Sequence, residues 1–393
     1  MRMWWAAFSR AAFALALTAY AAGADSIQPR KSGRADIAVR AAGWLDPASG
    51  ELRGPVAVLV AGQKIASVVA APAFDAKAAN SVIDLGNATL LPGLIDAHVH
   101  LQIGGQPRDN ALAALRAGFT TLVDLGATTD AVLRLRDAIA DGGVEGPRIL
   151  AAGLWVGSKN GICEFGGIGV AGGPEGFRER VRENVKAGAD LTKVCVSGWP
   201  AAAFAQPDAY EIKDEALVAV TEESKRSNRI VIAHAISLGA AKAASQAGVR
   251  GLAHSAFVDA AMAAEMKQRQ MFLIPTILTL TRQPGPASDA LRASLTTAHR
   301  AGVRLVFGTD GGVLPHGQNA AEFQAMAEAG IPAIEAIRAA TTNAAEAFAL
   351  GDAVGSLAEG KFADMIAVEG DPLRDLSALQ RVKFVMRNGR VVR

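Results

Sequence analysis

The sequence predicts an α/β protein in which a (β/α)8 TIM barrel is joined to a small β-sandwich domain built from both chain ends. Eight short apolar runs alternate with amphipathic helical stretches through the middle of the 393-residue chain. Valine-rich segments with turn residues flank this region on both sides. The predicted boundaries are 1–24 for a signal peptide, 25–90 and 346–393 for the β-sandwich, and 91–345 for the barrel.

The composition is that of an ordinary globular protein. Hydrophobic residues make up 50% of the chain and charged residues 20%, which excludes a disordered chain. The 40 basic and 38 acidic residues are dispersed and give a net charge of +2, so we expect no nucleic-acid partner. Cys163 and Cys195 are the only two cysteines, which excludes a disulfide framework and a cysteine-based zinc module.

The N-terminal segment is typical of a secretory signal peptide. Arg2 and Arg10 precede an apolar run at 11–22, and small residues with alanine spacing follow it. This run is shorter than the roughly 20 apolar residues that cross a bilayer, although an uncleaved membrane anchor is the alternative. We therefore expect a periplasmic or secreted protein that has no membrane contact after cleavage.

The first β elements surround a tight turn. The valine-rich runs 56–60 and 64–69 are separated by Ala61-Gly62-Gln63, which predicts a β-hairpin. The C-terminal segment predicts three further strands, at 362–368, 382–386 and 391–392, the last two meeting across Asn388-Gly389. Neither segment has enough strands to bury a core alone, so we expect the two to pair.

The barrel strands are predicted from the apolar runs between them. They lie at 94–98, 121–125, 148–152, 191–196, 230–234, 251–254, 272–276 and 304–308. Helical periodicity is found at 130–140, 174–187, 214–226, 238–247, 259–269, 288–301 and 319–329. A doubly wound open sheet is the competing fold, but no glycine-rich fingerprint follows the first strand.

Polar residues stand at the ends of five predicted strands. His98 and His100 end the first strand, and alternation points both side chains to one side. The others are Lys193, His234, His254 and Asp310, at the fourth, fifth, sixth and eighth strands. Because chemistry in such barrels lies at the carboxyl ends of the strands, we expect these six side chains to meet.

This set of residues is typical of a metal site. Neutral imidazoles and carboxylates are good zinc ligands, and a catalytic site leaves a position for water. Lys193 is the unusual member, because an ammonium group repels a cation. As an amine it would serve as a salt-bridge partner or a Schiff-base nucleophile, whereas carbon dioxide would convert it to a carbamate with two ligand oxygens.

The chain resembles the amidohydrolase superfamily over nearly all of its mature length. The motifs that carry the resemblance are LPGLIDAHVH at 91–100, AGFTTLVDL at 117–125, GADLTK at 188–193, VIAHA at 231–235, FGTDG at 307–311, HGQN at 316–319, AATTNAAEAF at 339–348 and GKFADMIA at 360–367. The most similar branch is the imidazolonepropionase-related group of zinc dipeptidases and carboxypeptidases, which is prolidase-like.

The resemblance implies two Zn²⁺ ions and hydrolysis of an amide or peptide bond, in a dipeptide or an N-acyl amino acid. One metal would be held by His98, His100 and Asp310. The second would be held by His234 and His254, with carboxylated Lys193 and a hydroxide bridging both. Asp310 would also act as the general base. Relatives commonly form homo-oligomers, so we expect one here.

Several alternative functions share this barrel. Deaminases hold one metal and carry a glutamate soon after the fifth-strand histidine, whereas His234 is followed by Ala235-Ile236-Ser237. A carboxypeptidase, an ochratoxin-type amide hydrolase, a lactone or phosphoester hydrolase and a non-catalytic binding barrel stay open. In many relatives a glutamate precedes the sixth-strand histidine, but this chain has Ala253, which leaves the support of His254 in doubt.

The substrate contacts are expected on the loops after the strands. The glycine-rich loop 155–173 is either a lid or a surface excursion, and Trp199 is either an apolar wall for the substrate or part of the core. His316 is placed to touch a substrate carbonyl or carboxylate, as in similar enzymes. Arg282 and Lys159 are either anchors for a terminal carboxylate or solvated charges.

The two cysteines come from adjacent barrel units. Cys163 follows the third strand and Cys195 lies in the fourth, two residues after Lys193. In an exported protein they form either a disulfide across the mouth of the barrel or a pair of free thiols.

Overall fold

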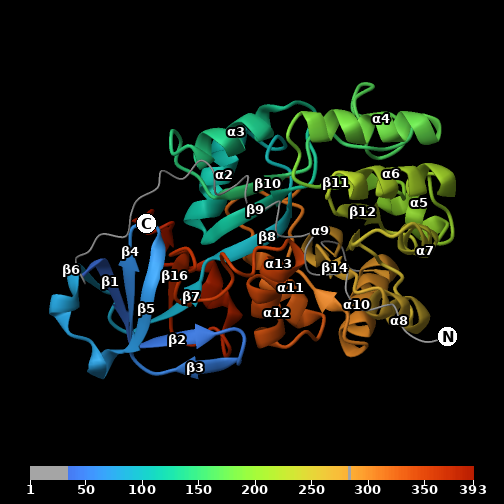
Figure 1. The fold of residues 1–393 in the computed structure, drawn as a ribbon. Helices are drawn as coiled ribbons and strands as arrows, with labels where there is room; N and C mark the ends of the chain where they lie inside the picture. Colours follow the sequence, from blue (N-terminus) through green and yellow to red (C-terminus); the bar gives the residue numbers. More distant parts are fainter. Residues whose placement is uncertain (1–33, 282–284) are drawn as a thin grey trace, which may run out of the picture.

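The computed structural model describes residues 34–281 and 285–393 (Figure 1). The predicted signal peptide at 1–24 and the predicted anchor Arg282 therefore lie outside the described residues. Among the helices of those two ranges, none combines the length and the apolar character that a membrane span requires.

Eight parallel strands form the barrel. They are β8 (Leu94–Val99), β9 (Phe119–Asp124), β10 (Arg148–Ala151), β11 (Thr192–Cys195), β12 (Val231–Ala235), β13 (Gly251–His254), β14 (Phe272–Ile274) and β15 (Arg304–Leu305). Strands β8 to β10 form one parallel sheet, and β11 to β15 form a second one.

Backbone hydrogen bonds close the two sheets into a barrel. Next to β10, the N–H of Cys195 donates to the carbonyl of Val156 at 2.8 Å. On the other side, the N–H of Ala97 donates to Phe307 at 2.9 Å, and that of Asp310 donates to His98 at 2.8 Å. The predicted eight-stranded barrel is thus confirmed, and its last strand continues beyond β15 as extended chain beside β8.

Helices surround the strands (Figure 1). They are α2 (Pro107–Arg116), α3 (Ala131–Ala140), α4 (Gly173–Lys186), α5 (Pro200–Ala205), α6 (Asp214–Arg226), α7 (Leu238–Gln246), α8 (Ala260–Gln268), α9 (Ile277–Leu280), α10 (Pro286–Arg300), α11 (Ala321–Glu328), α12 (Ala333–Ala339) and α13 (Thr342–Ala347). Seven of them match the sequence ranges to within two residues at each end. The other five, α2, α5, α9, α12 and α13, fall in segments for which no helical range was given.

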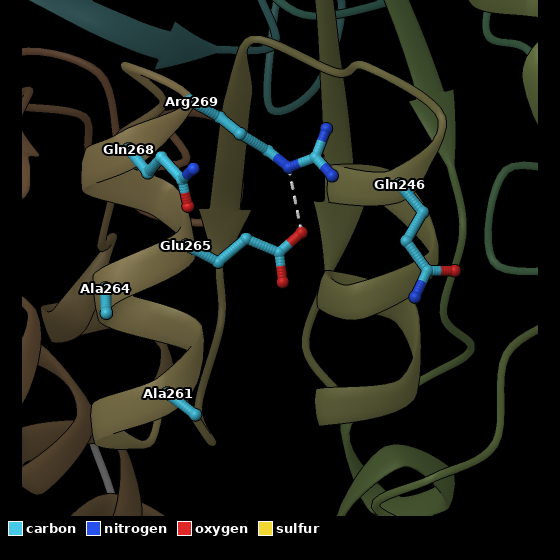
Figure 2. Close-up of a pocket in the computed structure, with 6 residues that line it drawn as sticks. All are labelled: Gln246, Ala261, Ala264, Glu265, Gln268 and Arg269. Carbon is cyan, nitrogen blue, oxygen red and sulfur yellow. Dashed lines mark ion pairs between the residues drawn. The ribbon is translucent and has the colours of Figure 1, made fainter.

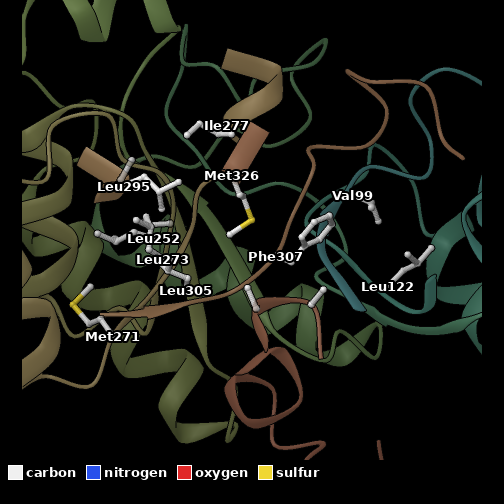
Figure 3. Packing of buried hydrophobic residues seen from close by; sticks show 14 of the residues in the cluster. Val99, Leu122, Leu252, Met271, Leu273, Ile277, Leu295, Leu305, Phe307 and Met326 are labelled. Atoms are coloured by element: carbon white, nitrogen blue, oxygen red, sulfur yellow. The ribbon is translucent and has the colours of Figure 1, made fainter. Parts of the chain in front are cut away.

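The strand side chains are apolar on both faces, as a barrel covered by helices requires. On the outer face, Leu252, Leu273 and Leu305 pack near Leu295 of α10 and Met326 of α11 (Figure 3). The alternate residues form a separate buried cluster that fills the barrel interior, and it includes Ile95, Val123, Ile232, Ile274 and Val306. Alternation therefore points His234, two residues after Ile232, and Thr276, two residues after Ile274, toward the mouth of the barrel.

The β-sandwich is built from both ends of the described chain. One sheet has the order β5-β4-β1-β6 and the other β18-β17-β16-β7-β2-β3. These strands are β1 (Ala35–Ala41), β2 (Gly43–Asp46), β3 (Glu51–Arg53), β4 (Val56–Ala61), β5 (Lys64–Ala70), β6 (Ala79–Asp84), β7 (Ala88–Pro92), β16 (Met365–Glu369), β17 (Phe384–Arg387) and β18 (Arg390–Val391), with short 3-10 helices η1 (Ala71–Ala73), η2 (Ala76–Ala78) and η3 (Leu376–Gln380).

Pairing of the two ends is visible where the blue and red strands lie together (Figure 1). Strand β16 runs antiparallel to β7, and Ile366 pairs with Leu91. The predicted hairpin is β4-β5, closed by a pair between Ala61 and Lys64. Val58 and Leu90 share one buried cluster with Met365 and Phe384, so residues from both ends build the same core.

A buried ion pair joins the barrel to the β-sandwich. Arg148 begins β10 and is only 2% exposed, and its guanidinium lies 2.7 Å from a carboxylate oxygen of Asp364. The same guanidinium donates to Thr121 Oγ1 at 3.2 Å and to Asn388 Oδ1 at 2.9 Å. Since Arg148 begins its strand, this contact lies at the amino-terminal end of the barrel, opposite the mouth.

Candidate metal centre

The end of β8 brings two histidines to one carboxylate. The Nε2 atoms of His98 and His100 each lie 3.3 Å from Oδ1 of Asp310. Asp310 reaches this position because its N–H donates to the carbonyl of His98. Both histidines thus point to the same side, and the three predicted residues meet at the mouth of the barrel.

The other two histidines continue this group as a row of rings. His98 lies 5.2 Å from His100 and 5.0 Å from His254, between ring centroids, and His254 lies 4.6 Å from His234. Ligand atoms of His98, His254 and Asp310 all lie within 4.8 Å of one another. Lys193 belongs to the same group, since its Nζ is 3.4 Å from Nε2 of His98. All six residues singled out from the strand ends are therefore gathered in one place.

Burial controls the charge state of these groups. Burial and the neighbouring Lys193 hold the pKa of His98 well below its usual range, and burial lowers the pKa of His254 to about 3. Burial likewise lowers the pKa of Lys193 to about 7, against the opposing charge of Asp310. For Asp310 burial acts to raise the pKa, but the interactions with His98 and His100 hold it well below its usual range. Neutral imidazoles beside an ionised carboxylate are the forms that bind metal.

The orientation of the histidine rings also suits a divalent cation. Nδ1 of His100 lies 3.0 Å from the carbonyl of Gly126, and Nδ1 of His254 lies 2.7 Å from Oγ1 of Thr276. Occupied Nδ1 atoms leave Nε2 free as the ligand atom. Nδ1 of His98 is buried with no hydrogen-bond partner, so the group has unused bonding capacity.

Asp96 is a buried carboxylate that was not selected from the sequence. It accepts hydrogen bonds from Thr309 Oγ1 at 2.6 Å, Asn319 Nδ2 at 2.7 Å, and the N–H groups of His98 and Thr309 at 3.1 Å. Burial raises its pKa to about 6. Asp96 thus fixes the backbone that carries His98 and the residue before Asp310. Its position two residues before His98 was the signal that could have identified it.

Asp124, at the end of β9, plays a similar part for His100. Its carboxylate accepts from the N–H of Leu101 at 2.7 Å and from the N–H of Gly126 at 3.1 Å. Burial raises its pKa to about 6, although the charge of His100 opposes the shift. An acid at the end of the second strand obeys the same strand-end rule as the six predicted residues, so this signal was also present in the sequence.

Several residues of the centre have an unusual backbone. His254, Ser255, Thr276 and Asp310 have φ values of 76°, 47°, 45° and 59°. Such left-handed conformations cost non-glycine residues about 1–2 kcal/mol each, and they are retained when the surroundings fix them. All four residues lie at one end of the barrel. The contacts that position their side chains there therefore outweigh the conformational cost of the left-handed backbone.

The predicted substrate contacts have different environments. His316 is half-buried against the centre, with Nε2 3.3 Å from the carbonyl oxygen of His100 and Nδ1 buried without a partner. Trp199 begins α5 as its N-cap residue and is 59% exposed, so it is not part of the core. Lys159 is an exposed loop residue with no contact to the six-residue group.

The loop 155–173 packs against the centre. Trp155 is 4% exposed, and its ring lies 5.4 Å from that of His100 and 4.3 Å from that of Phe165, on which it stacks. A disulfide between Cys163 and Cys195 joins this loop to β11, with the Cα atoms 6.1 Å apart. The aromatic stack therefore runs from the partly exposed Phe165 down to His100.

A groove on the helical surface lies apart from this centre. It runs between α7 and α8 and is lined by Gln246, Ala261, Ala264, Glu265, Gln268 and Arg269 (Figure 2). Glu265 and Arg269 form an ion pair at 2.9 Å across one turn of α8. Since helices run against the strand direction, Gln246 and Arg269, at the ends of their helices, lie toward the amino-terminal end of the barrel.

Comparisons with known proteins agree with this geometry. The family model described as "Amidohydrolase family" matches residues 89–392. Ochratoxinase of Aspergillus niger is 28% identical over 412 residues, covering 89% of this chain and 85% of that protein. An uncharacterized protein of Mycobacterium tuberculosis is also 28% identical, over 79% of this chain and 87% of its own length.

Solved structures give the same picture. A Xaa-Pro dipeptidase with bound methionine has a TM-score of 0.84 and 28% identity, covering 90% of this chain and 99% of the other. The structure of A. niger ochratoxinase has a TM-score of 0.80 and 26% identity, covering 90% and 95%. These likenesses extend over the barrel and the β-sandwich together.

Proposed function

Because the chain belongs to the amidohydrolase family and is a hydrolase of amide or peptide C–N bonds, we propose that it is a binuclear zinc enzyme that cleaves a dipeptide or an N-acyl amino acid. The observation that carries the proposal is the row of four histidine rings with Asp310 and Lys193 beside it. A row of this length offers separate donor groups at its two ends, which supports two cations rather than one.

Each metal has its own set of residues in this proposal. His98, His100 and Asp310 hold one cation, and His234 and His254 hold the other. Lys193 joins the two as a carbamate, formed when its amine nitrogen bonds to the carbon of carbon dioxide and releases one proton. This change replaces a cationic group that lies 3.4 Å from Nε2 of His98 by an anion with two ligand oxygens. When bound, the two cations would supply an activated water and would polarise the scissile carbonyl.

Asp310 and His316 move the proton and place the substrate. Oδ1 of Asp310 is ionised and lies among the ligand atoms, so it accepts a proton from the attacking water and passes it to the leaving amine. His316 lies against the carbonyl of His100 with one ring nitrogen lacking a partner, which leaves that nitrogen available to a substrate carbonyl or carboxylate.

A second candidate is an amide of an aromatic group, as in an ochratoxin-type hydrolase or a carboxypeptidase. The stack of Phe165 on Trp155 favours it, because this apolar surface begins at solvent, where Phe165 is 37% exposed, and ends at His100. Aromatic pairs contribute about 0.5–1.5 kcal/mol beyond area burial. Phe165→Ala should therefore raise KM about 5-fold for an aromatic amide but not for an acetyl amide, measured by steady-state kinetics; equal KM changes would refute this candidate.

We also propose that the protein is exported and assembles as a homo-oligomer. The disulfide supports export, since such bonds persist in oxidising compartments. Titration of free thiols in the denatured, unreduced protein tests the bond, and two reactive thiols per chain would refute it. Size-exclusion chromatography with light scattering tests the assembly.

Metal analysis followed by a substrate screen tests the enzymatic proposal. The purified protein should contain two metals per chain and should hydrolyse some members of a panel of dipeptides and N-acyl amino acids. Lys193→Ala is the matched variant, and it should lose one metal and most activity. Full activity of Lys193→Ala with one metal per chain would refute the binuclear site. Turnover of lactones or phosphoesters without amide hydrolysis would refute the substrate class.

A further inference from the structure

His254 is supported by a hydroxyl group that comes from the neighbouring barrel unit. Its Nδ1 lies 2.7 Å from Oγ1 of Thr276, both residues are buried, and the preceding Ala253 has no polar side chain to offer. We propose that Thr276, held in place by Glu322, is the positioning residue of His254 and sets the affinity of the metal that His254 binds. The inference rests on the proposed metal function of the histidines.

The direction of the Thr276 contact follows from what His254 must do. A ring that binds a cation through Nε2 carries its proton on Nδ1, and Nδ1 then needs an acceptor. The hydroxyl oxygen of Thr276 is an acceptor at the right distance. A partner of this kind selects the ligating tautomer and fixes the ring plane, and removing such a partner typically weakens metal affinity 10–100-fold.

Thr276 keeps this position at a cost to its backbone. Its φ and ψ are 45° and 47°, in the left-handed region, where a β-branched residue is a clear outlier. Only Pro275 separates Thr276 from the end of β14, and Thr276 directly precedes α9 (Ile277–Leu280). The surroundings must therefore fix this conformation, because nothing intrinsic to threonine favours it.

Glu322 of α11 supplies that constraint. Its two carboxylate oxygens accept from the N–H of Ile277 at 2.6 Å and from the N–H of Leu278 at 2.8 Å. These are the first two N–H groups of α9, which have no partner within the helix. An N-cap side chain normally accepts from the second or third N–H group of a helix. Thr276 is the N-cap residue of α9 but makes no such bond. Because Glu322 caps the helix instead, the Thr276 hydroxyl is left for His254.

The decisive variant is Thr276→Gly. Glycine favours the left-handed backbone at this position, so the chain should fold, but the hydroxyl is lost. Thr276→Ser keeps the hydroxyl and tests rescue. Thr281→Val is the matched control, because Thr281 donates to the carbonyl of Ile277 at 2.7 Å in the same turn and makes no contact with a histidine.

The readout is the zinc dissociation constant of each site, from competition with a chromogenic chelator on the full-length protein, together with the Tm of the metal-free form. Thr276→Gly should bind one of its two metals 10–100-fold more weakly, whereas Thr276→Ser and Thr281→Val should stay within about 3-fold of the unmodified protein. The metal-free Tm of Thr276→Gly should stay close to that of Thr281→Val, since a purely structural role would change Tm and leave zinc affinity unchanged.

Glu322→Gln tests the second step, because an amide group places a donor against one N–H of α9. It should weaken the same metal several-fold. Zinc affinities of Thr276→Gly or Glu322→Gln equal to those of the unmodified protein would overturn the inference while the proposed function stands. If the unmodified protein binds fewer than two metals, the proposed function fails first, and the inference fails with it.

Discussion

The two ends of the barrel both bury charged groups, but they treat them differently. At the amino-terminal end, Arg148 is matched by Asp364 and receives further acceptors from Thr121 and Asn388. At the mouth, His98 and His100 share one carboxylate oxygen of Asp310, and Lys193 lies beside His98 without a carboxylate of its own in hydrogen-bond distance among the described residues. Nδ1 atoms of His98 and His316 are buried there without any hydrogen-bond partner.

This difference separates a structural ion pair from a functional site. A buried charge destabilises a protein unless it is neutralised and its hydrogen bonds are satisfied. The Arg148 pair meets both conditions, so it can join the barrel to the β-sandwich without further ligands. The mouth meets these conditions only in part, because ring nitrogens there lack partners, and this unused bonding capacity supports the proposed binding of a cation and a substrate.

The largest expected effect is that of Asp310→Asn at the mouth. The amide cannot accept the proton, so kcat should fall about 10²–10⁴-fold. Metal content should fall much less, because His98 and His100 remain. Steady-state kinetics with metal analysis of the same sample checks this, and a loss of activity only in proportion to lost metal would show that Asp310 is a ligand and not a base.

At the opposite end, Asp364→Ala should act on stability alone. It leaves the buried Arg148 without its counter-charge, which typically lowers the free energy of unfolding by about 3–5 kcal/mol. Denaturant unfolding measures this change, and kcat per folded molecule should stay constant. The double variant Arg148→Met with Asp364→Leu removes both charges and should recover most of the loss. A changed kcat in the folded single variant would contradict the separation of the two ends.

The disulfide between Cys163 and Cys195 should stabilise the mouth of the barrel. The opposite end is stabilised by the buried ion pair of Arg148 and Asp364 instead. Replacing Cys163 and Cys195 together by serine removes a cross-link between residues 32 positions apart and should lower the free energy of unfolding by about 2–4 kcal/mol. It should also release the loop that carries Trp155 and Phe165, so KM should rise. Denaturant unfolding measures the change in stability, and steady-state kinetics measures the change in KM. If the parent protein is fully oxidised and the double variant is equally stable, the disulfide does not stabilise the mouth.

Glu322 should give the metal-free protein a pH-dependent stability. Burial raises its pKa to about 8, although two backbone N–H groups favour the charged form. Because the folded value lies above the unfolded one, this stability is fully present below about pH 4.5 and is lost as the pH rises through about 8. Between pH 6 and 7.5 the loss amounts to about 2 kcal/mol. In urea unfolding, the free energy of unfolding of Glu322→Gln should lack this dependence on pH. If it changes with pH in parallel with that of the unmodified protein, Glu322 is not the group responsible.

Much of the centre could be predicted from the sequence because its residues obey a local rule. Five of the six predicted residues lie at the end of an apolar run or just after it, and strand geometry brings the carboxyl ends of parallel strands to one rim. Lys193 lies inside β11. The same rule held for Asp124, which ends β9 and shows that a strand-end acid deserves selection even without a histidine neighbour. Asp96 lies inside β8, and its signal was its position two residues before His98. Trp199 was ambiguous for a related reason, since its exposure depends on the course of the loop and not on a strand.

The sequence by itself determined the barrel strands, the pairing of the two chain ends and the polar residue types at the mouth. The strands follow from short-range periodicity, the pairing from the small number of strands in each end segment, and the polar residues from their positions along the strands. Only the tertiary structure decided how those ligands are held. The contacts of His254 with Thr276, of Glu322 with Ile277 and of Arg148 with Asp364 join residues 22, 45 and 216 positions apart. Such contacts form only when the barrel closes and the β-sandwich packs against it, so no local sequence pattern predicts them.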